Sequence, residues 1–524
     1  MKLWIRQKSV LAVVIFFAVI AGFLLTWGPI FMGYEKETAL SALSFWQGDY
    51  QIFRSGLAPI LLYQPFIAFG SWFFPNRLEA ILTLVPVFYS AATAVIVFLI
   101  FEKITQKISV SILLSLLVAF GSLLWPYSRI GMEYPATFFL CLLALSLLFW
   151  QEKRISSIVV GAILALAVLS KSYGLLFVLP TTVFILLALK QQGQIRQFFS
   201  SEFLVKLFGF TLLGLATILA LNHKLYGQWQ GIYFLRQEFQ IWSFWEGWFG
   251  TFFSFGKSLF LYSPLLLISV FYWPAFARKF PALFGFILTA FLALLLITAP
   301  FSFWSDETLS VRKLMPIVPL LHLPLFLAFQ QKFTPLENAN DRVGGNKSDA
   351  LGRWLFKATI GSLTGFTSWF KAFCFGIIIV LALYFQLINS LYPYWRQLEF
   401  LRPYNLDNLP TMRYNPKLSH LSLNNKFFLS LAKNRLTGKS GNFFYQERSW
   451  MRCCTYPKEA DKTLTRINVS LSAFERPDTY LFKQSALLKT RKIFAFLDVG
   501  ALILLGSLLM ANYFYHGRLE NQKE

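Results

Sequence analysis

Charged residues are scarce in this chain, since Asp, Glu, Lys and Arg together make up 14% of its 524 residues. Soluble domains carry roughly a quarter. With 56% apolar residues, the chain lacks the polar side chains that a water-facing surface requires. The composition excludes a soluble enzyme and predicts that most of the chain faces lipid.

Acidic residues are outnumbered by basic ones, and the formal net charge is +23. In a soluble chain this excess would suggest nucleic-acid binding. Here the bases stand in short runs between apolar stretches, which is the pattern of loops beside a bilayer whose anionic lipids attract Lys and Arg. We therefore expect membrane lipids, and no nucleic acid, as partners.

Residues that would mark a cofactor, a metal or a disulfide framework are also few. No Gly-rich nucleotide-binding loop occurs, and the histidines are scattered and expected to be structural: His223, His322, His420 and His516. Cys141 and Cys374 lie in apolar runs as packing residues, whereas Cys453 and Cys454 are adjacent and would form a strained mutual bond. The sequence predicts no cofactor and no catalytic metal.

Long apolar runs are abundant. The first, at 9–32, follows Lys2, Arg6 and Lys8 and is long enough to cross about 30 Å of hydrocarbon, so we interpret it as a retained helix. Further runs cover 80–101, 108–125, 134–150, 156–170, 173–189, 205–221, 258–275, 281–299, 313–329, 372–391 and 493–514. The sequence predicts an all-α polytopic membrane protein with about twelve transmembrane helices and with interfacial helices in the first outer loop.

Basic loops orient these helices, because cytoplasmic loops are enriched in Lys and Arg. The bias places both termini in the cytoplasm, and the inner (plasma) membrane of a bacterium is the expected location. The organisation that follows is a transmembrane core at 1–330, a cytoplasmic loop at 331–371, a helix at 372–392, an extracytoplasmic segment or small domain at 393–491, and a last helix with a cytoplasmic tail at 492–524.

Four outer segments carry ionisable residues: GYEKETALSALSFWQGDY, WPYSRIGMEYPATFF, AVLSKSYGLLFVLP and WSDETLSVRKLMPIVPLL. Each also has a plain structural interpretation. Carboxylates after a first span often only solvate the interface, and an Arg and a Glu four apart can pair locally. A lone Lys at a helix end usually snorkels. The basic residues predicted on the outer side are either ordinary exceptions to the enrichment of Lys and Arg in cytoplasmic loops, or they line a cationic outer pocket.

Taken in order, these segments resemble the GT-C membrane glycosyltransferases that use polyprenyl-phosphate-linked sugars, among them protein O-mannosyltransferases and lipid A aminoarabinose transferases. GYEKETALSALSFWQGDY is similar to the acidic motif after the family's first span, although Tyr34 stands where the first acid is usual. YSRIGMEYP, LSKSYGLLFVLP, SFGKSLFLYSP and SVRKLMPIVP resemble later family segments. The resemblance covers residues 10–330 and implies that the transmembrane core at 1–330 is catalytic.

The resemblance implies a sugar transfer at the outer face, with inversion, to a lipid, glycan or protein acceptor. It assigns catalytic roles to Glu35 as general base, Glu37 as the second choice and Glu133 as a supporting acid. Substrate-binding roles fall to Asp49, Arg129, Lys171, Lys257 and Arg312, the bases holding the lipid phosphate.

Three alternatives remain open. An O-antigen ligase or polymerase would also have about twelve helices and a large outer loop, and would act on a lipid diphosphate through outer Arg and His residues. A secondary transporter would need ionisable or broken helices at the bilayer midplane and often two repeated halves. A noncatalytic partner of a glycan-assembly complex is the third.

Overall fold

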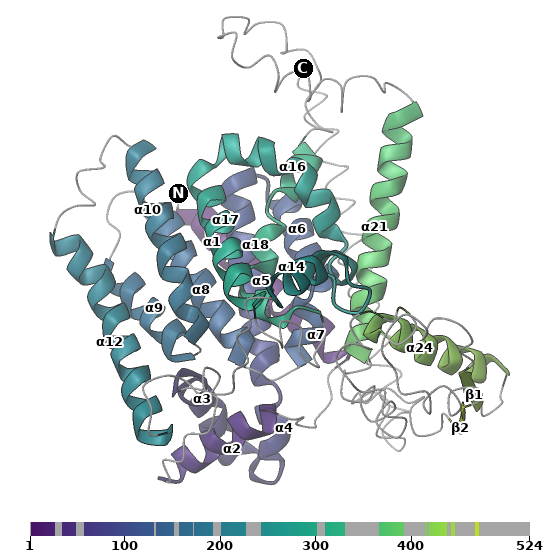
Figure 1. Ribbon diagram of the computed structural model, residues 1–524, viewed down its shortest axis with the longest axis horizontal. Coiled ribbons are helices and arrows are strands. Elements are labelled where there is room, and N and C mark those ends of the chain that lie inside the picture. The colour runs from purple at the N-terminus through teal and green to yellow at the C-terminus, as the bar shows by residue number, and fades with distance from the viewer. Residues whose placement is uncertain are drawn as a thin grey trace, which may run out of the picture.

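The computed structural model shows a body of packed helices with a smaller C-terminal part at one end (Figure 1). It describes residues 2–26, 34–48, 57–129, 133–150, 157–170, 172–191, 201–226, 243–300, 310–330, 366–391, 414, 416, 419–437, 442–445 and 467–470.

The elements are almost all helical, with 3₁₀ turns labelled η. The N-terminal part contains α1 (Lys2–Leu24), α2 (Tyr34–Trp46), α3 (Leu57–Phe73), η1 (Pro75–Arg77), α4 (Leu78–Leu82), α5 (Val85–Thr105), α6 (Ile108–Gly121), α7 (Leu124–Arg129), α8 (Glu133–Trp150), α9 (Ser157–Ser170), η2 (Ser172–Phe177), α10 (Val178–Gln191) and α12 (Ser201–Tyr226). The rest contains α14 (Phe244–Phe253), α15 (Leu259–Tyr262), α16 (Leu265–Lys279), α17 (Pro281–Thr298), η4 (Arg312–Ile317), α18 (Val318–Leu321), α19 (Leu325–Gln330), α21 (Phe366–Leu391) and α24 (His420–Thr437).

Several of these helices are suited to crossing a bilayer. The described stretches long and apolar enough to do so are Val85–Thr105, Gly174–Gln191, Pro281–Thr298, Arg312–Phe329 and Phe373–Leu391. Each predicted span up to residue 391 coincides with one or more helices. The last predicted span, 493–514, lies outside the described residues. The chain is a multi-pass helical membrane protein.

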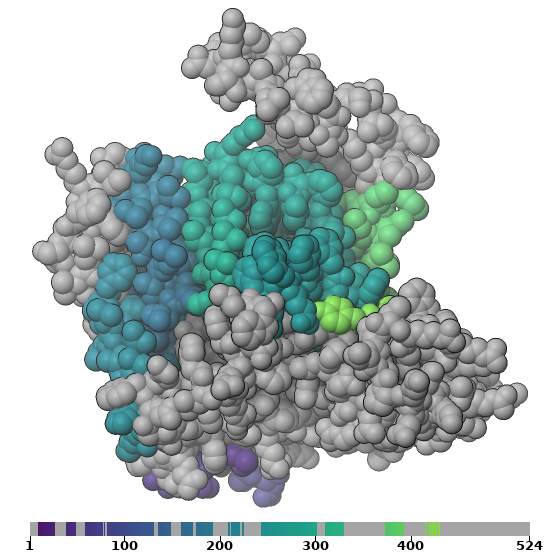
Figure 2. Space-filling view, viewed as in Figure 1, coloured from purple at the N-terminus to yellow at the C-terminus, as the bar shows by residue number. Residues whose placement is uncertain are grey.

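Large apolar side chains remain exposed on the outside of the helical body. Phe271 is 79% exposed, Phe253 71% and Val380 65%. In water such a surface would drive association, whereas lipid solvates it. Figure 2 shows α10, α12, α16 and α17 side by side on one face, as blue and teal surfaces. These exposed side chains therefore fit helices surrounded by hydrocarbon.

Proline divides two of the predicted spans. The run 258–275 is interrupted at Ser263, and Pro264 then caps α16. The run 313–329 is present as a spanning stretch, which starts as η4 and continues as the short helices α18 and α19. Pro316, Pro319 and Pro324 have no N–H to donate to a preceding turn. The predicted span at 313–329 therefore exists, and its prolines explain why it is built of short helical pieces.

Glycine permits close helix contacts at two positions. A Cβ at Gly22 of α1 would lie 2.4 Å from the Phe120 ring of α6, and a Cβ at Gly247 of α14 would lie 2.3 Å from the carbonyl oxygen of Ala299. A larger residue at Gly247 would meet the backbone and push α14 away from Ala299, whereas one at Gly22 would require the Phe120 ring to move. The contacts join α1 to α6 and seat α14 across the end of α17.

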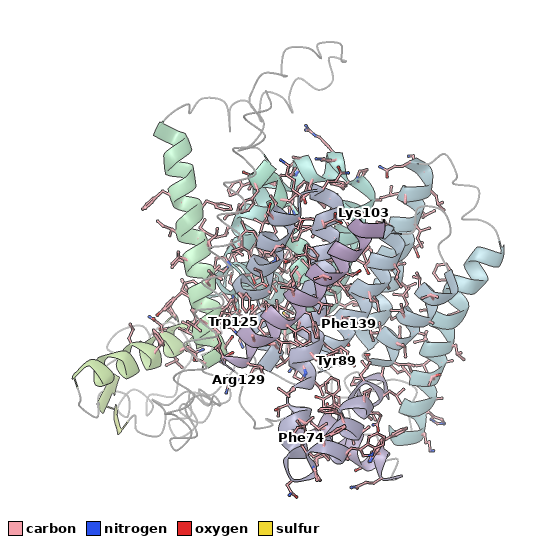
Figure 3. All side chains as sticks on the ribbon, turned by 180° about the vertical axis from the view of Figure 1, so that it is seen from behind. Phe74, Tyr89, Lys103, Trp125, Arg129 and Phe139 are labelled. Carbon is pink, nitrogen blue, oxygen red and sulfur yellow. The ribbon has the colours of Figure 1, made fainter. Side chains whose placement is uncertain are left out.

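The segments predicted to lie outside gather at one end of the body. Figure 3 places Lys103, expected in the cytoplasm, and Arg129, expected outside, at opposite ends. In Figure 1, α2, α3, α4, α7 and α24 all lie toward the end that carries Arg129. The expected helices of the first outer loop are thus present as α2 and α3.

The 393–491 segment departs from the all-α prediction. Its strands β1 (Asn442–Tyr445) and β2 (Ile467–Ser470) pair antiparallel, with Asn442 opposite Ser470 and Tyr445 opposite Ile467. The alternation in four-residue strands is too short to distinguish from a loop pattern. The all-α prediction is therefore wrong for this segment and holds for the rest of the described chain.

Candidate functional site

Helices α2 and α3 form a pair held together by an amide side chain. Gln64 Nε2 donates to the carbonyl oxygen of Ala42 at 3.1 Å and to that of Ile60 at 2.9 Å. The first bond crosses from α3 to α2, and the second fixes the Gln64 rotamer along its own helix. The first outer loop therefore contains a helical hairpin formed by α2 and α3.

An apolar cluster attaches this hairpin to the transmembrane helices. It includes Ala39 of α2, Ile60 of α3, Tyr89 of α5 and Ala136 of α8. Tyr89 Oη also donates to the carbonyl oxygen of Leu62 at 3.1 Å. The hairpin is therefore packed on α5 and α8 at the end of the body that carries Arg129.

Three acidic residues with predicted catalytic roles lie in the first turns of helices that contribute to this apolar cluster. Glu35 lies one turn before Ala39, and Glu133 opens α8 one turn before Ala136. That α8 begins at Glu133 confirms the expectation of an acid at this helix start. The side chains of Glu35, Glu37 and Glu133 are not among those described, and Asp49 and Lys171 lie outside the described residues. Their roles stay predictions.

Arg129 ends α7 and reaches the end of a helix distant in sequence. Its guanidinium donates through Nη1 to the carbonyl oxygens of Ser390, at 2.6 Å, and Leu391, at 3.0 Å. These carbonyls belong to the last turn of α21, where no intrahelical donor exists and a cation is favoured. Arg129 thus has a structural role in attaching α21 to α7.

Lys257 lies in the turn between α14 and α15 and is fully buried. Its Nζ is 3.3 Å from Nε2 of His420, the first residue of α24. Ser310 Oγ donates to the carbonyl oxygen of Lys257 at 3.1 Å. Arg312, half-buried at the start of η4, follows two residues later. The fold therefore brings the neighbourhoods of two predicted phosphate ligands together.

Further hydrogen bonds link this region to α21. Gln386 donates to the carbonyl oxygen of Tyr262, whose hydroxyl accepts from the backbone N–H of Leu421 at 3.2 Å. Asn424 Nδ2 donates to Asn389 Oδ1 at 2.9 Å. We call the following set the outer polar cluster: Arg129, Lys257, Gln386, Asn389, Ser390, His420 and Asn424.

Most of the outer polar cluster was missed at the sequence level. His420 was expected to be an isolated structural histidine, and the fold instead places it against Lys257. One signal was present: the run QLINS contributes Gln386, Asn389 and Ser390 to the end of an otherwise apolar span. Polar residues are rare in membrane-spanning helices unless they face a partner or a cavity.

An apolar pocket of about 310 Å³ lies beside the outer polar cluster, between α1, α6, α7 and α21. Its lining consists of Gly22, Leu25, Phe120, Trp125, Leu383, Tyr384 and Leu387. Trp125 Nε1 donates to Thr26 Oγ1 at 3.0 Å, and the indole ring packs T-shaped against Phe120. Trp125 stands one turn before Arg129 on α7, so the pocket and the polar cluster adjoin.

Within the part of the chain that the structure describes, no three His, Cys, Asp or Glu residues are grouped as a metal site would require. Several predicted acids lie outside it, so the expected absence of a catalytic metal stays a prediction.

No protein-family model matches the chain, and no curated protein does. Among solved structures, the crystal structure of ArnT from Cupriavidus metallidurans bound to undecaprenyl phosphate is similar, with 11% sequence identity and a TM-score of 0.43. The similarity covers 80% of this chain and 75% of that one.

Proposed function

We propose that this chain is a membrane glycosyltransferase that moves a sugar from a polyprenyl phosphate to a lipid, glycan or protein acceptor at its extracytoplasmic face. One observation carries the proposal. Helices α2 and α8, whose first turns carry the predicted acids, pack into one apolar cluster. This cluster lies at the same end of the molecule as Lys257 and Arg129 of the outer polar cluster. The family resemblance assigns these same positions to acid and phosphate-binding roles.

The proposed reaction needs one base and one anion-binding site. The acceptor hydroxyl oxygen bonds to the anomeric carbon while the bond from that carbon to the phosphate oxygen breaks. The hydroxyl proton passes to a carboxylate, for which Glu35 is the first candidate and Glu37 the second. The lipid phosphate leaves with the bonding electron pair and gains negative charge, which a fixed cation such as Lys257 stabilises.

The apolar pocket supports a lipid donor. Its lining offers aromatic and aliphatic side chains, and its wall is shared with α21, which ends at the outer polar cluster. An isoprenoid chain seated in it would bring its phosphate toward that cluster. We assign the pocket to the first isoprene units of the donor.

The test is a transfer assay with the purified full-length protein in lipid nanodiscs. The donors are a panel of radiolabelled polyprenyl-phosphate sugars, and the acceptor is a membrane extract. Glu35→Gln should lower turnover by about 10²- to 10⁴-fold, because a general base acts only in the transition state.

Glu37→Gln is the matched control. Residues two apart on a helix point about 200° apart, so only one of the two carboxylates faces a given site. It should retain most of the activity. Near-normal turnover in both variants would contradict a base on α2, and a wild-type protein that transfers no sugar from any donor would overturn the proposed function.

One observation favours the ligase-like alternative. Such an enzyme would use outer Arg and His residues on a lipid diphosphate, and the structure places His420 of the 393–491 segment in the outer polar cluster. The donor separates the two functions. Transfer from a polyprenyl diphosphate glycan, with none from polyprenyl monophosphate sugars, would establish the alternative instead.

A further inference from the structure

The end of α21 carries buried polar groups whose hydrogen-bonding capacity is not used within the described part of the chain. Asn389 is 1% exposed, and Gln386 and Ser390 are fully buried. Among the described residues, Asn389 Nδ2, Ser390 Oγ and Gln386 Oε1 have no hydrogen-bond partner. Buried hydrogen-bond donors nearly always have an acceptor. A ligand or a water molecule is therefore expected beside the two donors, Asn389 Nδ2 and Ser390 Oγ.

These donors adjoin Lys257 through α24. His420 and Asn424 are four residues apart and therefore lie on one face of that helix, about 6 Å apart along its axis. His420 contacts Lys257, and Asn424 donates to Asn389. The ammonium of Lys257 and the amide of Asn389 are thus held by neighbouring positions on the same helix face.

The Lys257 contact defines what His420 can do. A lysine ammonium has donors and no acceptor, so His420 Nε2 must supply a lone pair to the 3.3 Å contact. The imidazole is then neutral, with its proton on Nδ1. His420 in this state orients the Lys257 ammonium without adding a charge of its own.

We propose that Lys257 Nζ and Asn389 Nδ2 bind the phosphate monoester of the lipid donor, and that His420 is a positioning residue for Lys257. The inference rests on the proposed function and adds to it a ligand from α21 and a positioning residue from α24, which the family resemblance does not cover. It makes α24 part of the donor site, because the core supplies Lys257 and the extracytoplasmic segment supplies the residue that orients it.

Equilibrium binding of a polyprenyl phosphate without sugar, to the full-length protein in nanodiscs, tests the proposal. Asn389→Asp keeps the oxygen that accepts from Asn424 and replaces the Nδ2 donor by an anionic acceptor. It should weaken binding by about 10- to 100-fold, as expected for the loss of a hydrogen bond to a charged group. Lys257→Met should weaken binding to a similar extent.

His420 is tested by two substitutions that differ in where they place a polar atom. His420→Gln puts an oxygen near the position of Nε2 and should retain affinity, whereas His420→Asn reaches only the position of Nδ1 and should lose it. In a double-mutant cycle, His420→Asn should have no further effect once Lys257 is Met, because His420 acts through Lys257. Additive losses would overturn the positioning role.

His322→Asn is the control for a buried histidine. Its Nδ1 lies 2.7 Å from the carbonyl oxygen of Val318, a bond that Asn can replace, and its Nε2 has no partner among the described residues. Affinity should be unchanged. Competition arms with inorganic phosphate and with phosphatidylglycerol vesicles identify the source of the phosphate, and displacement by either at equal concentration would overturn the donor assignment.

Unchanged affinity in both Asn389→Asp and Lys257→Met would overturn the proposed site. Because this assay requires no turnover, its failure is distinguishable from failure of the transferase proposal, which is decided by sugar transfer.

Discussion

Arg129 illustrates how one side chain can link distant parts of a membrane protein. Its guanidinium donates to two carbonyls of α21 that are 261 and 262 residues away. A planar guanidinium can present two N–H groups to adjacent acceptors, whereas a lysine ammonium is a point charge. The residue that the resemblance nominated for phosphate binding is therefore also the C-terminal cap of a helix.

Arg129→Ala should destabilise the protein, because the last turn of α21 loses its donor and the last carbonyls of a buried helix end are left unsatisfied. We expect a loss of about 1–3 kcal/mol, and a smaller one for Arg129→Lys. Thermal unfolding in detergent measures both.

The control for Arg129 is Arg278→Ala. Arg278 also stands in the last turn of a helix, α16, but is exposed, so its removal should change stability by no more than about 0.5 kcal/mol. Equal melting temperatures for Arg129→Ala and the wild type would show that the cap contributes nothing measurable.

At the scale of elements, the apolar pocket depends on how α1, α6, α7 and α21 meet. Gly22 lets α1 approach Phe120, whose ring packs edge-on against Trp125 with centroids 5.2 Å apart. Leu383, Tyr384 and Leu387 of α21 form the opposite wall. The pocket is consequently a product of three separate parts of the chain.

Leu387→Trp should fill part of this pocket. If the pocket holds the first isoprene units of the donor, KM for a long polyprenyl-phosphate sugar should rise several-fold, since each excluded methylene contributes about 0.8 kcal/mol of burial. Turnover at saturating donor should change little, because the substitution removes binding that is equal in the ground and transition states.

Leu381→Trp places the same side chain on an exposed part of α21 outside the pocket. Its KM should match that of the wild type. A Leu387→Trp protein with unchanged KM for long-chain donors would remove the pocket from the donor-binding site.

At the scale of the whole molecule, two ends are distinguished. The hairpin of α2 and α3, the end of α7, and α24 share one end, and Lys103 lies at the other (Figures 1 and 3). This agrees with the orientation inferred from the basic loops, in which the first group is extracytoplasmic. The agreement concerns the relative placement of segments and leaves the direction in the membrane as a prediction.

Topology reporters decide that direction. A fusion after Lys347 should report a cytoplasmic location, and a fusion after Lys439 an extracytoplasmic one; both positions lie outside the described residues. Paired fusions that label each side, such as a phosphatase and a fluorescent protein, provide the control for each other. The reverse pair of results would move the proposed site to the cytoplasmic face and contradict transfer outside.

Hydropathy along the chain is enough to predict a helical membrane protein and the positions of most of its helices. Hydropathy over about twenty residues is a local property, and in lipid an apolar run must satisfy its backbone internally, so it becomes a helix. The acid that opens α8 and the helical first outer loop were likewise predictable, because helix starts and apolar patterns are local signals. The irregular turns at Pro316, Pro319 and Pro324 follow from the missing N–H of proline, which is also a local property.

Which of the scattered polar residues meet depends on how the helices pack in three dimensions. Lys257 and His420 are 163 residues apart, and Asn389 and Asn424 belong to different predicted parts of the chain. No short-range pattern encodes these pairings, because they depend on how α21 and α24 pack against the core. A histidine that was unremarkable in the sequence became part of the outer polar cluster for that reason, and the same packing brought Arg129 to the end of α21.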